Sequence, residues 1–301
     1  MKNFKNKVAV ITGGASGIGF GLAKLCVKKG IKTVIADIEE TALLKAKSEL
    51  ETLGGEILSV ITDVSKLEDV KNLADITLKA YGEVHLLFNN AGVGANPLIT
   101  LTTMKDYKWV LGVNLWGVIH GIQIFLPIMQ KQDKNCRIIN TTSGYGIVPG
   151  NAAYGISKFG VTALSEMLAQ ELNYFKSKVK VSLLVPGVVN TAIVDSQRNR
   201  PKELLNPEIP VDPEIMKIWE KRGEEIRKVF SKGMSPSLVA EIVFNAIEDE
   251  IFYIFCELPM ETGAKNRLDG MMDGFKSLRN FIKKNKYSEK DFVGSESVNI
   301  I

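Results

Sequence analysis

The sequence VAVITGGASGIG, residues 8–19, decides the fold of this chain. Its first residues, Val8 to Ile11, are apolar β-formers and predict a buried strand. The glycines that follow allow a tight turn and a close approach of the backbone, and the helix that starts there has unpaired amide groups that can hold a pyrophosphate. The stretch therefore predicts a dinucleotide site, although its glycine spacing is not G-x-G-x-x-G. A plain strand-turn-helix corner is the alternative.

The next predicted strand, residues 33–36, ends at Asp37, which lies 18 residues after Gly19. A carboxylate at this position can accept hydrogen bonds from the adenine ribose hydroxyls and repels a 2′-phosphate. The glycine turn carries no basic residue, and Ile38 stands where an arginine would meet a phosphate. These features favour NAD over NADP. The alternative is an ordinary exposed aspartate at the end of a strand.

Strand and helix patterns alternate along most of the chain. Predicted helices at 20–29, 41–53 and 67–81 separate predicted strands at 33–36, 57–61 and 84–88. Right-handed crossovers between parallel strands follow from this alternation. The predicted fold class is therefore α/β, a single Rossmann-like doubly wound parallel sheet with helices on both faces. Further strands are predicted at 137–142, 182–185 and 251–256, and further helices at 110–126, 152–172 and 235–246.

Composition narrows the class of protein. Of the formal net charge of +4, a net +5 lies within residues 265–286, so the main body is close to neutral and a nucleic-acid surface is not expected. Three cysteines at distant positions indicate neither disulfides nor a metal site, which fits a cytoplasmic protein. No apolar run approaches the ~18 residues of a membrane span. His85 and His120 are expected to be packed rather than catalytic.

Four motifs resemble those of the short-chain dehydrogenase/reductase family: TGGASGIG at 12–19, Asp63-Val64, NNAG at 89–92 and Tyr154-x-x-x-Lys158. The resemblance covers residues 5–257. It implies a Rossmann-like fold and NAD(P)-dependent oxidation or reduction at a hydroxyl or carbonyl carbon. It also implies a set of cofactor-binding residues, namely Gly13, Ser16, Gly17, Ile18, Gly19, Asp37, Asp63, Val64, Asn90, Ala91, Gly92, Tyr154, Lys158, Pro186, Gly187, Val189 and Thr191.

Tyr154 and Lys158 are four residues apart in a predicted helix and should share one face. A tyrosine titrates near pH ~10, and a nearby ammonium lowers its pKa, so Tyr154 is the expected general acid or base. The resemblance adds Ser143 as the hydroxyl that binds the substrate oxygen and Asn114 as the support of a water-linked proton relay. Because the loop after Ser143 is short, Thr142 is an alternative to Ser143 as this hydroxyl. For Tyr154 and Lys158, the alternative is that they are ordinary exposed surface residues without a catalytic role.

Residues 1–260 are expected to form the catalytic domain, with a substrate lid at about 191–230. Apolar lid residues favour an apolar substrate: Ile193, Val194, Leu204, Leu205 and Ile209. Residues 261–301 are expected to be an extension with an amphipathic helix and a polar tail. The chain is expected to be a homodimer or homotetramer through apolar faces at 111–126 and 161–172.

The sequence thus predicts an NAD(H)-dependent oxidoreductase that transfers a hydride between nicotinamide and a secondary alcohol or ketone. Its partner is a small molecule, and the identity of that molecule does not follow from the sequence. One alternative is an NADPH-dependent ketone or 3-oxoacyl reductase. A remote alternative is a non-catalytic NAD-binding sensor or scaffold.

Overall fold

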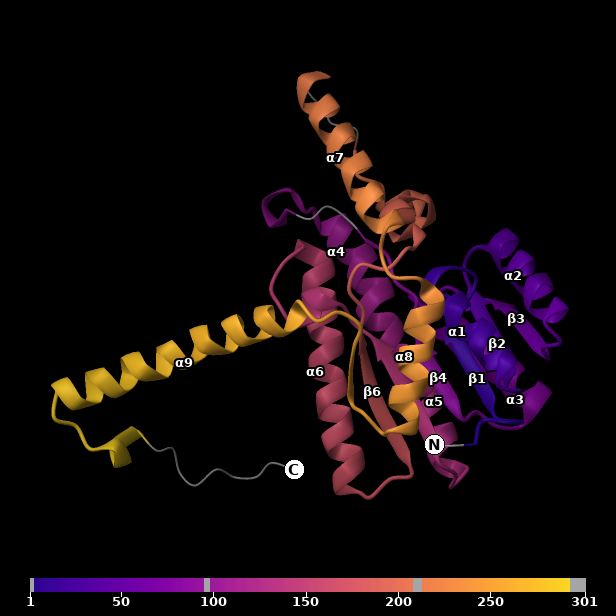
Figure 1. Cartoon of the computed structure of the whole chain (residues 1–301), viewed down its shortest axis with the longest axis horizontal. Helices are drawn as coiled ribbons and strands as arrows, with labels where there is room; N and C mark the ends of the chain where they lie inside the picture. The colour runs from indigo at the N-terminus through magenta and orange to yellow at the C-terminus, as the bar shows by residue number, and fades with distance from the viewer. Residues whose placement is uncertain (1–2, 95–97, 208–212, 293–301) are drawn as a thin grey trace. The chain divides into compact units, whose positions relative to one another are not determined.

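The computed structural model describes residues 3–94, 98–207 and 213–292. It consists of two compact units, Met1–Cys256 and Glu257–Ile301 (Figure 1). The first unit holds the sheet and every residue of the predicted site.

In the described part of the first unit, seven parallel strands form one sheet in the order β3-β2-β1-β4-β5-β6-β7. The strand order reverses between β1 and β4, and such a switch point opens a crevice at the carboxyl ends of the strands. The prediction of a doubly wound parallel sheet is therefore confirmed. The strands are β1 (Val8–Thr12), β2 (Lys32–Asp37), β3 (Ile57–Ile61), β4 (Leu86–Asn89), β5 (Cys136–Thr141), β6 (Val179–Val185) and β7 (Tyr253–Phe255).

Helices cover both faces of this sheet (Figure 1). On one face α1 (Gly17–Lys28) packs against α8 (Pro236–Glu248) and α2 (Glu40–Thr52). On the other face α3 (Leu67–Tyr81) packs against α5 (Gly117–Lys131). The helix α6 (Ala152–Tyr174) lies beside them, in contact with β5 and β6. Because both faces are covered, the central strands are almost continuously apolar, and β1 is buried along its whole length.

The predicted helix 110–126 is divided in the structure. It comprises α4 (Met104–Leu111), a π-helical turn over Gly112–Trp116, and α5. Small residues let this run approach the sheet: a Cβ added at Gly121 would lie 2.1 Å from Asn89 Oδ1. Among the described residues, Met104–Lys131 is the one helical run long and apolar enough to cross a membrane by length and composition. It is in contact with β4, β5, α3 and α6, so it serves here as a core helix.

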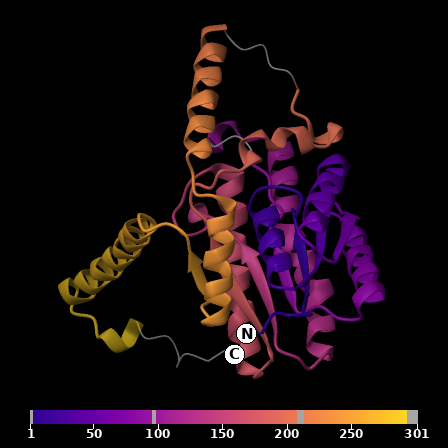
Figure 2. The ribbon, with the colours of Figure 1, turned by 45° about the vertical axis from the view of Figure 1, so that its right-hand side comes forward.

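The segment predicted as a lid begins with two short 3-10 helices, η4 (Ala192–Asn199) and η5 (Lys202–Leu204). The helix α7 (Pro213–Ser231) follows and extends away from the sheet (Figure 2). Ile209, one of the predicted apolar lid residues, lies outside the described residues. The role of this segment as a substrate lid stays a prediction.

The second unit contains α9 (Met260–Lys284) and a short 3-10 helix, η6 (Glu289–Phe292). The ring of Tyr287 stacks on that of Phe281 with centroids 5.9 Å apart and meets Phe292 edge-on. The helix expected for this extension is present. Of the predicted polar tail, residues 293–301 lie outside the described part of the chain.

Candidate active site

The glycine turn joins β1 to α1 at the carboxyl edge of the sheet. Gly13 and Gly17 have φ angles of +63° and +51°, which L-residues with side chains rarely adopt. A Cβ on Gly19 would lie 2.1 Å from the carbonyl oxygen of Gly13. Ser16 is the exposed N-cap residue of α1 and its side chain makes no capping bond, while Ile18 packs against the core. The turn is therefore tightly closed in the way the sequence predicts, while its role in binding an anion stays a prediction.

Thr12 fixes the glycine turn to the loop after β4. Its Oγ1 accepts hydrogen bonds from the backbone N–H groups of Asn90 at 2.9 Å and Ala91 at 3.1 Å. Asn90 Nδ2 in turn donates to the carbonyl oxygen of Thr12 at 3.1 Å. The Asn90-Ala91-Gly92 segment is thus held against the turn. The prediction from the sequence assigned Thr12 no such role. The position of its hydroxyl at the end of a buried strand is the sequence feature that could have indicated it.

Asp37 lies at the end of β2 and faces the glycine turn. Its carboxylate accepts hydrogen bonds from the backbone N–H groups of Ala15 at 3.1 Å and Glu39 at 3.2 Å. Burial raises the pKa of Asp37, and these two hydrogen bonds oppose that rise. The acidic group therefore lies beside the predicted pyrophosphate turn, as the sequence placed it.

Asp63 and Val64 follow β3. Asp63 Oδ1 accepts hydrogen bonds from the Ser65 hydroxyl at 2.6 Å and the Ser65 N–H at 3.0 Å, which closes a tight turn. Val64 is buried, and its carbonyl oxygen bonds His120 Nδ1 at 2.9 Å. His120 thus holds the loop after β3 to α5 and has a structural contact.

The loop after β6 returns toward the glycine turn. The backbone of Val189 pairs with that of Met234, which fixes the loop, and the carbonyl oxygen of Pro186 accepts the N–H of Gly144 at 3.3 Å. A Cβ added at Gly17 would lie 2.8 Å from Thr191 Cγ2. The structure therefore brings the predicted 186–191 segment, which includes Gly187, next to the start of α1.

Tyr154 and Ser143 lie together at the start of α6. A hydrogen bond from Ser143 lowers the pKa of Tyr154, but burial has the larger effect and raises it. The sequence predicts that Lys158 lowers the pKa of Tyr154, but this effect does not appear in the structure. Thr142 is directed elsewhere, because its Oγ1 donates to the carbonyl oxygen of Lys158 at 2.8 Å and lies 3.0 Å from Thr162 Oγ1. Of the two hydroxyls left open by the sequence, the geometry favours Ser143.

Lys158 is a buried cation without a carboxylate partner among the ion pairs of the described residues. Its Nζ donates to the carbonyl oxygen of Thr141 at 2.9 Å and lies 5.5 Å from the centroid of the Tyr154 ring. Burial lowers its pKa to about 8. An ammonium has three donors, so Lys158 retains hydrogen-bonding capacity for a bound ligand.

Asn114 lies in the π-helical turn between α4 and α5, where it is completely buried. Its Oδ1 accepts the N–H of Val93 at 2.8 Å, and its Nδ2 donates to the Val93 carbonyl at 2.9 Å and to Ser157 Oγ at 3.2 Å. The side chain therefore joins the loop after β4 to α6. π-helical turns often occur at functional sites, and here the turn supplies this bridge.

The backbone before Tyr154 is strained. Asn151 and Ala152, neither of which is glycine, have φ angles of +61° and +37°. A Cβ on Gly155 would lie 1.8 Å from the carbonyl oxygen of Gly150, so the chain is tightly folded where α6 begins. Sequence reasoning missed this feature, for which the G-N-A-A run carries only a weak signal.

The two histidines have structural contacts. His85 is buried, its Nδ1 accepts the N–H of Val8 at 3.2 Å, and burial lowers its pKa to about 4, so it is neutral at pH 7. Across the described residues no cluster of three or more histidine, cysteine or acidic side chains could hold a metal ion.

The residues present fit a nicotinamide dinucleotide. Gly92 lies between the site residues of two elements, since a Cβ added there would make van der Waals contact with Asn114 Oδ1 at 3.5 Å and Lys158 Nζ at 3.6 Å. The spare donors of Lys158 face this position and provide hydrogen bonds for a polar ligand.

Comparison with known proteins agrees with this geometry. A family model described as short chain dehydrogenase matches residues 7–202. The chain therefore belongs to the short-chain dehydrogenase family and is an oxidoreductase of the class that acts between CH–OH and C=O groups.

Particular relatives are similar over most of their length. A CLA biosynthesis dehydrogenase/reductase of Lactiplantibacillus plantarum is 32% identical over 257 residues, 84% of this chain and 89% of that protein. A C alpha-dehydrogenase of a Sphingobium species is 31% identical over 276 residues, 91% of this chain and 88% of that protein. Among solved structures, a short-chain dehydrogenase/reductase from Burkholderia phymatum in complex with NAD has a TM-score of 0.85 at 37% identity, covering 90% of this chain and 96% of that one.

Proposed function

We propose that the protein is an NAD(H)-dependent oxidoreductase that interconverts a secondary alcohol and its ketone, with Tyr154 as the general acid and base. The observation that carries the proposal is the placement of Tyr154 between the Ser143 hydroxyl and the buried, unpaired ammonium of Lys158. A bound nicotinamide supplies the hydride acceptor or donor. The chain's own residues must then bind the substrate, orient it toward the nicotinamide and transfer one proton to or from its oxygen.

In oxidation, the Tyr154 phenolate takes the proton of the substrate hydroxyl, and in reduction the phenol returns it to the carbonyl oxygen. The Ser143 hydroxyl donates a hydrogen bond to the same substrate oxygen. Lys158 is charged below its pKa of about 8, and its positive charge favours the phenolate. Burial raises the pKa of Tyr154, and in this structure the Ser143 hydrogen bond, not Lys158, opposes that rise. We therefore expect Lys158 to favour the phenolate in the complex with cofactor and substrate.

The preference for NAD over NADP rests on Asp37. Its carboxylate occupies the two backbone N–H groups that could otherwise bind a phosphate oxygen, and its charge repels such a group. A cytoplasmic location is supported by three free, buried cysteines. Assembly into a homodimer or homotetramer remains our expectation, supported by the exposed Trp116 and Met167 on the two predicted faces.

The test is Tyr154→Phe, which removes one oxygen atom and keeps the ring. Turnover of a panel containing 2-propanol, 2-octanol, cyclohexanol and 1-phenylethanol, followed by NADH absorbance, should fall at least ~100-fold, while NADH still binds. Tyr145→Phe is the matched control, since its ring meets that of Tyr154 edge-on at 6.4 Å, and it should keep turnover within about tenfold.

Near-wild-type turnover by Tyr154→Phe would refute the assigned role. NADPH supporting faster turnover than NADH would favour the ketone or oxoacyl reductase alternative. NADH binding without turnover of any alcohol, ketone or oxoacyl thioester would favour the sensor or scaffold.

A further inference from the structure

Residues 192–207, here called the strap, are tied to the Rossmann core by side chains at separate points. Ser196 Oγ accepts the N–H of Gly94 at 2.8 Å and donates to its carbonyl oxygen at 3.2 Å. Arg198 pairs with Glu39, just after β2, at 2.7 Å. The strap therefore spans from the loop after β2 to the loop after β4.

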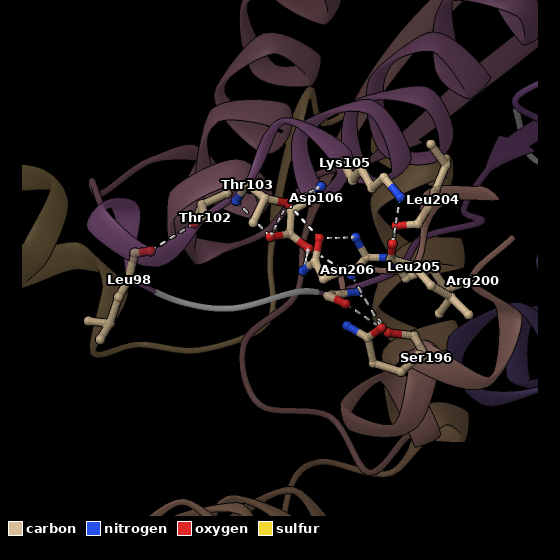
Figure 3. Close-up of polar contacts among 12 residues, drawn as sticks. Leu98, Thr102, Thr103, Lys105, Asp106, Ser196, Arg200, Leu204, Leu205 and Asn206 are labelled. Carbon is tan, nitrogen blue, oxygen red and sulfur yellow. Dashed lines mark hydrogen bonds and ion pairs between the residues drawn. The ribbon is translucent and has the colours of Figure 1, made fainter. Parts of the chain in front are cut away.

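A third attachment is buried. Arg200 Nη1 lies 2.7 Å from Asp106 Oδ1, and each of the two side chains is only 3% exposed. Figure 3 shows the two groups directed at each other, with Asn206 beside them. Asn206 Nδ2 donates to Asp106 Oδ1 at 3.1 Å, and Thr103 N–H donates to Asp106 Oδ2 at 2.8 Å. We call Thr103, Asp106, Arg200 and Asn206 the latch.

The latch is fully bonded, which distinguishes it from an exposed ion pair. Hydrogen bonds from Thr103, Arg200 and Asn206 outweigh the effect of burial and lower the pKa of Asp106. The Arg200 guanidinium also lies 5.1 Å from the centroid of the Trp109 ring. Buried charges are costly unless paired in this way, so the position of the strap at Arg200 is strongly fixed.

The latch fixes the backbone at one apolar residue, Leu204, that packs against the same cluster as the proposed acid/base. Arg200 Nε donates to the carbonyl oxygen of Leu204 at 2.8 Å (Figure 3). Leu204 and Tyr154 both pack against a single apolar cluster formed by Val93, Trp109, Val110 and Ala153. A shift of Leu204 would therefore change the packing of an apolar cluster that Tyr154 also contacts.

We propose that the Asp106–Arg200 pair positions Leu204 as an apolar wall of the substrate pocket beside Tyr154, so that Arg200 is a positioning residue and Leu204 a specificity-determining one. The inference rests on the proposed function. Both arginines of the strap are engaged by carboxylates, so neither is available to bind an anionic substrate. The wall fits a secondary alcohol or ketone with a neutral alkyl or aryl substituent.

The test compares kcat/KM for 1-phenylethanol and 2-propanol with NAD in three variants. Leu204→Ala removes the wall directly. Asp106→Leu/Arg200→Met removes both latch charges and leaves no unpaired buried ion, which protects the fold. The control Arg198→Gln removes an exposed pair of the same strap. Leu204→Met, which conserves side-chain volume, tests rescue.

We expect Leu204→Ala and the double variant to lose about tenfold in kcat/KM for 1-phenylethanol, mainly through KM, and less than about threefold for 2-propanol. The ratio of the two values should be unchanged in Arg198→Gln and nearly restored in Leu204→Met. Equal losses on both alcohols, or an unchanged ratio in Leu204→Ala, would overturn the wall while wild-type turnover still supports the proposed function. A wild-type protein inactive on every alcohol and ketone would overturn both proposals.

Discussion

The glycine turn, residues 12–19, and the strap both border the carboxyl edge of the sheet, but they are held in different ways. The glycines of the turn are fixed by backbone contacts that leave no room for a Cβ, as at Gly19, and the Thr12 hydroxyl ties the turn to the loop after β4. The strap is fixed by charged and polar side chains, of which the Asp106–Arg200 pair is the most buried. The comparison teaches that the glycines of the turn should tolerate almost no substitution, whereas we expect the strap to accept other side chains and to change substrate specificity when it does.

Two buried cations, one in the strap and one in the candidate active site, also differ in how they are held. Arg200, in the strap, has a carboxylate partner. Lys158, in the candidate active site, has only a backbone carbonyl as its hydrogen-bond partner among the described residues. A buried charge whose hydrogen-bonding groups all have partners fixes the position of the segment that carries it. A buried charge with spare donors costs stability and is retained for a ligand.

The largest effect that would test the contrast is expected from Gly19→Ala. The new Cβ would lie 2.1 Å from the Gly13 carbonyl oxygen and 2.8 Å from Asn90 Nδ2, so the turn must open. We expect a loss of about 3 kcal/mol in the free energy of unfolding and a loss of NADH binding. Denaturant unfolding and NADH fluorescence titration are the measurements.

The matched control is Gly223→Ala in α7. There the nearest neighbour of a new Cβ is Arg227 Nη1 at 3.6 Å, so the helix should gain up to about 1 kcal/mol. If both variants changed stability by similar amounts, the distinction between a closed turn and a permissive lid segment would fail.

The second effect concerns pH. Lys158 has a pKa of about 8 when folded, below its ordinary value of 10.5, so between these two pH values the unfolded chain binds more protons. The free energy of unfolding should therefore rise with pH in this window, by about 2 kcal/mol between pH 7.5 and 10. Below pH 8 the full cost of burying the charge is present. Denaturant unfolding of the ligand-free protein at both pH values measures the rise.

Comparison with Lys158→Met isolates this contribution, because other groups titrate equally in the two proteins. The variant should lack the rise, while the exposed Lys178→Met should retain it. A rise of the same size in Lys158→Met would contradict the interpretation of Lys158 as an unpaired buried cation.

The smallest effect is expected from Asp37→Ser. Loss of the carboxylate frees the N–H groups of Ala15 and Glu39 and removes the repulsion of a 2′-phosphate. The NADPH/NADH ratio of binding constants should increase about tenfold, measured by fluorescence titration. Glu40→Gln, a change of a nearby exposed acid at the start of α2, should leave the ratio unchanged. An unchanged ratio in Asp37→Ser would remove the basis of the NAD preference.

Much of the fold could be predicted because its signals are local. The strand-turn-helix pattern at 8–19 and the alternation of apolar runs gave the parallel sheet, since strands buried on both faces must be apolar throughout. The division of Met104–Lys131 could not be predicted. The π-helical turn at Gly112–Trp116 lies where Asn114 bonds the backbone of Val93 and the hydroxyl of Ser157, and such contacts between distant segments have no local pattern.

The sequence by itself determined the positions of Tyr154, Lys158, Ser143 and Asp37 in the chain, because motif spacing and helix periodicity are short-range properties. Only the tertiary structure decided which partner each of them meets. It directed Thr142 into α6, made burial the main influence on the pKa of Tyr154, and joined Asp106 to Arg200 across 94 residues. Such pairings depend on the packing of distant segments, and a local pattern carries no information about them.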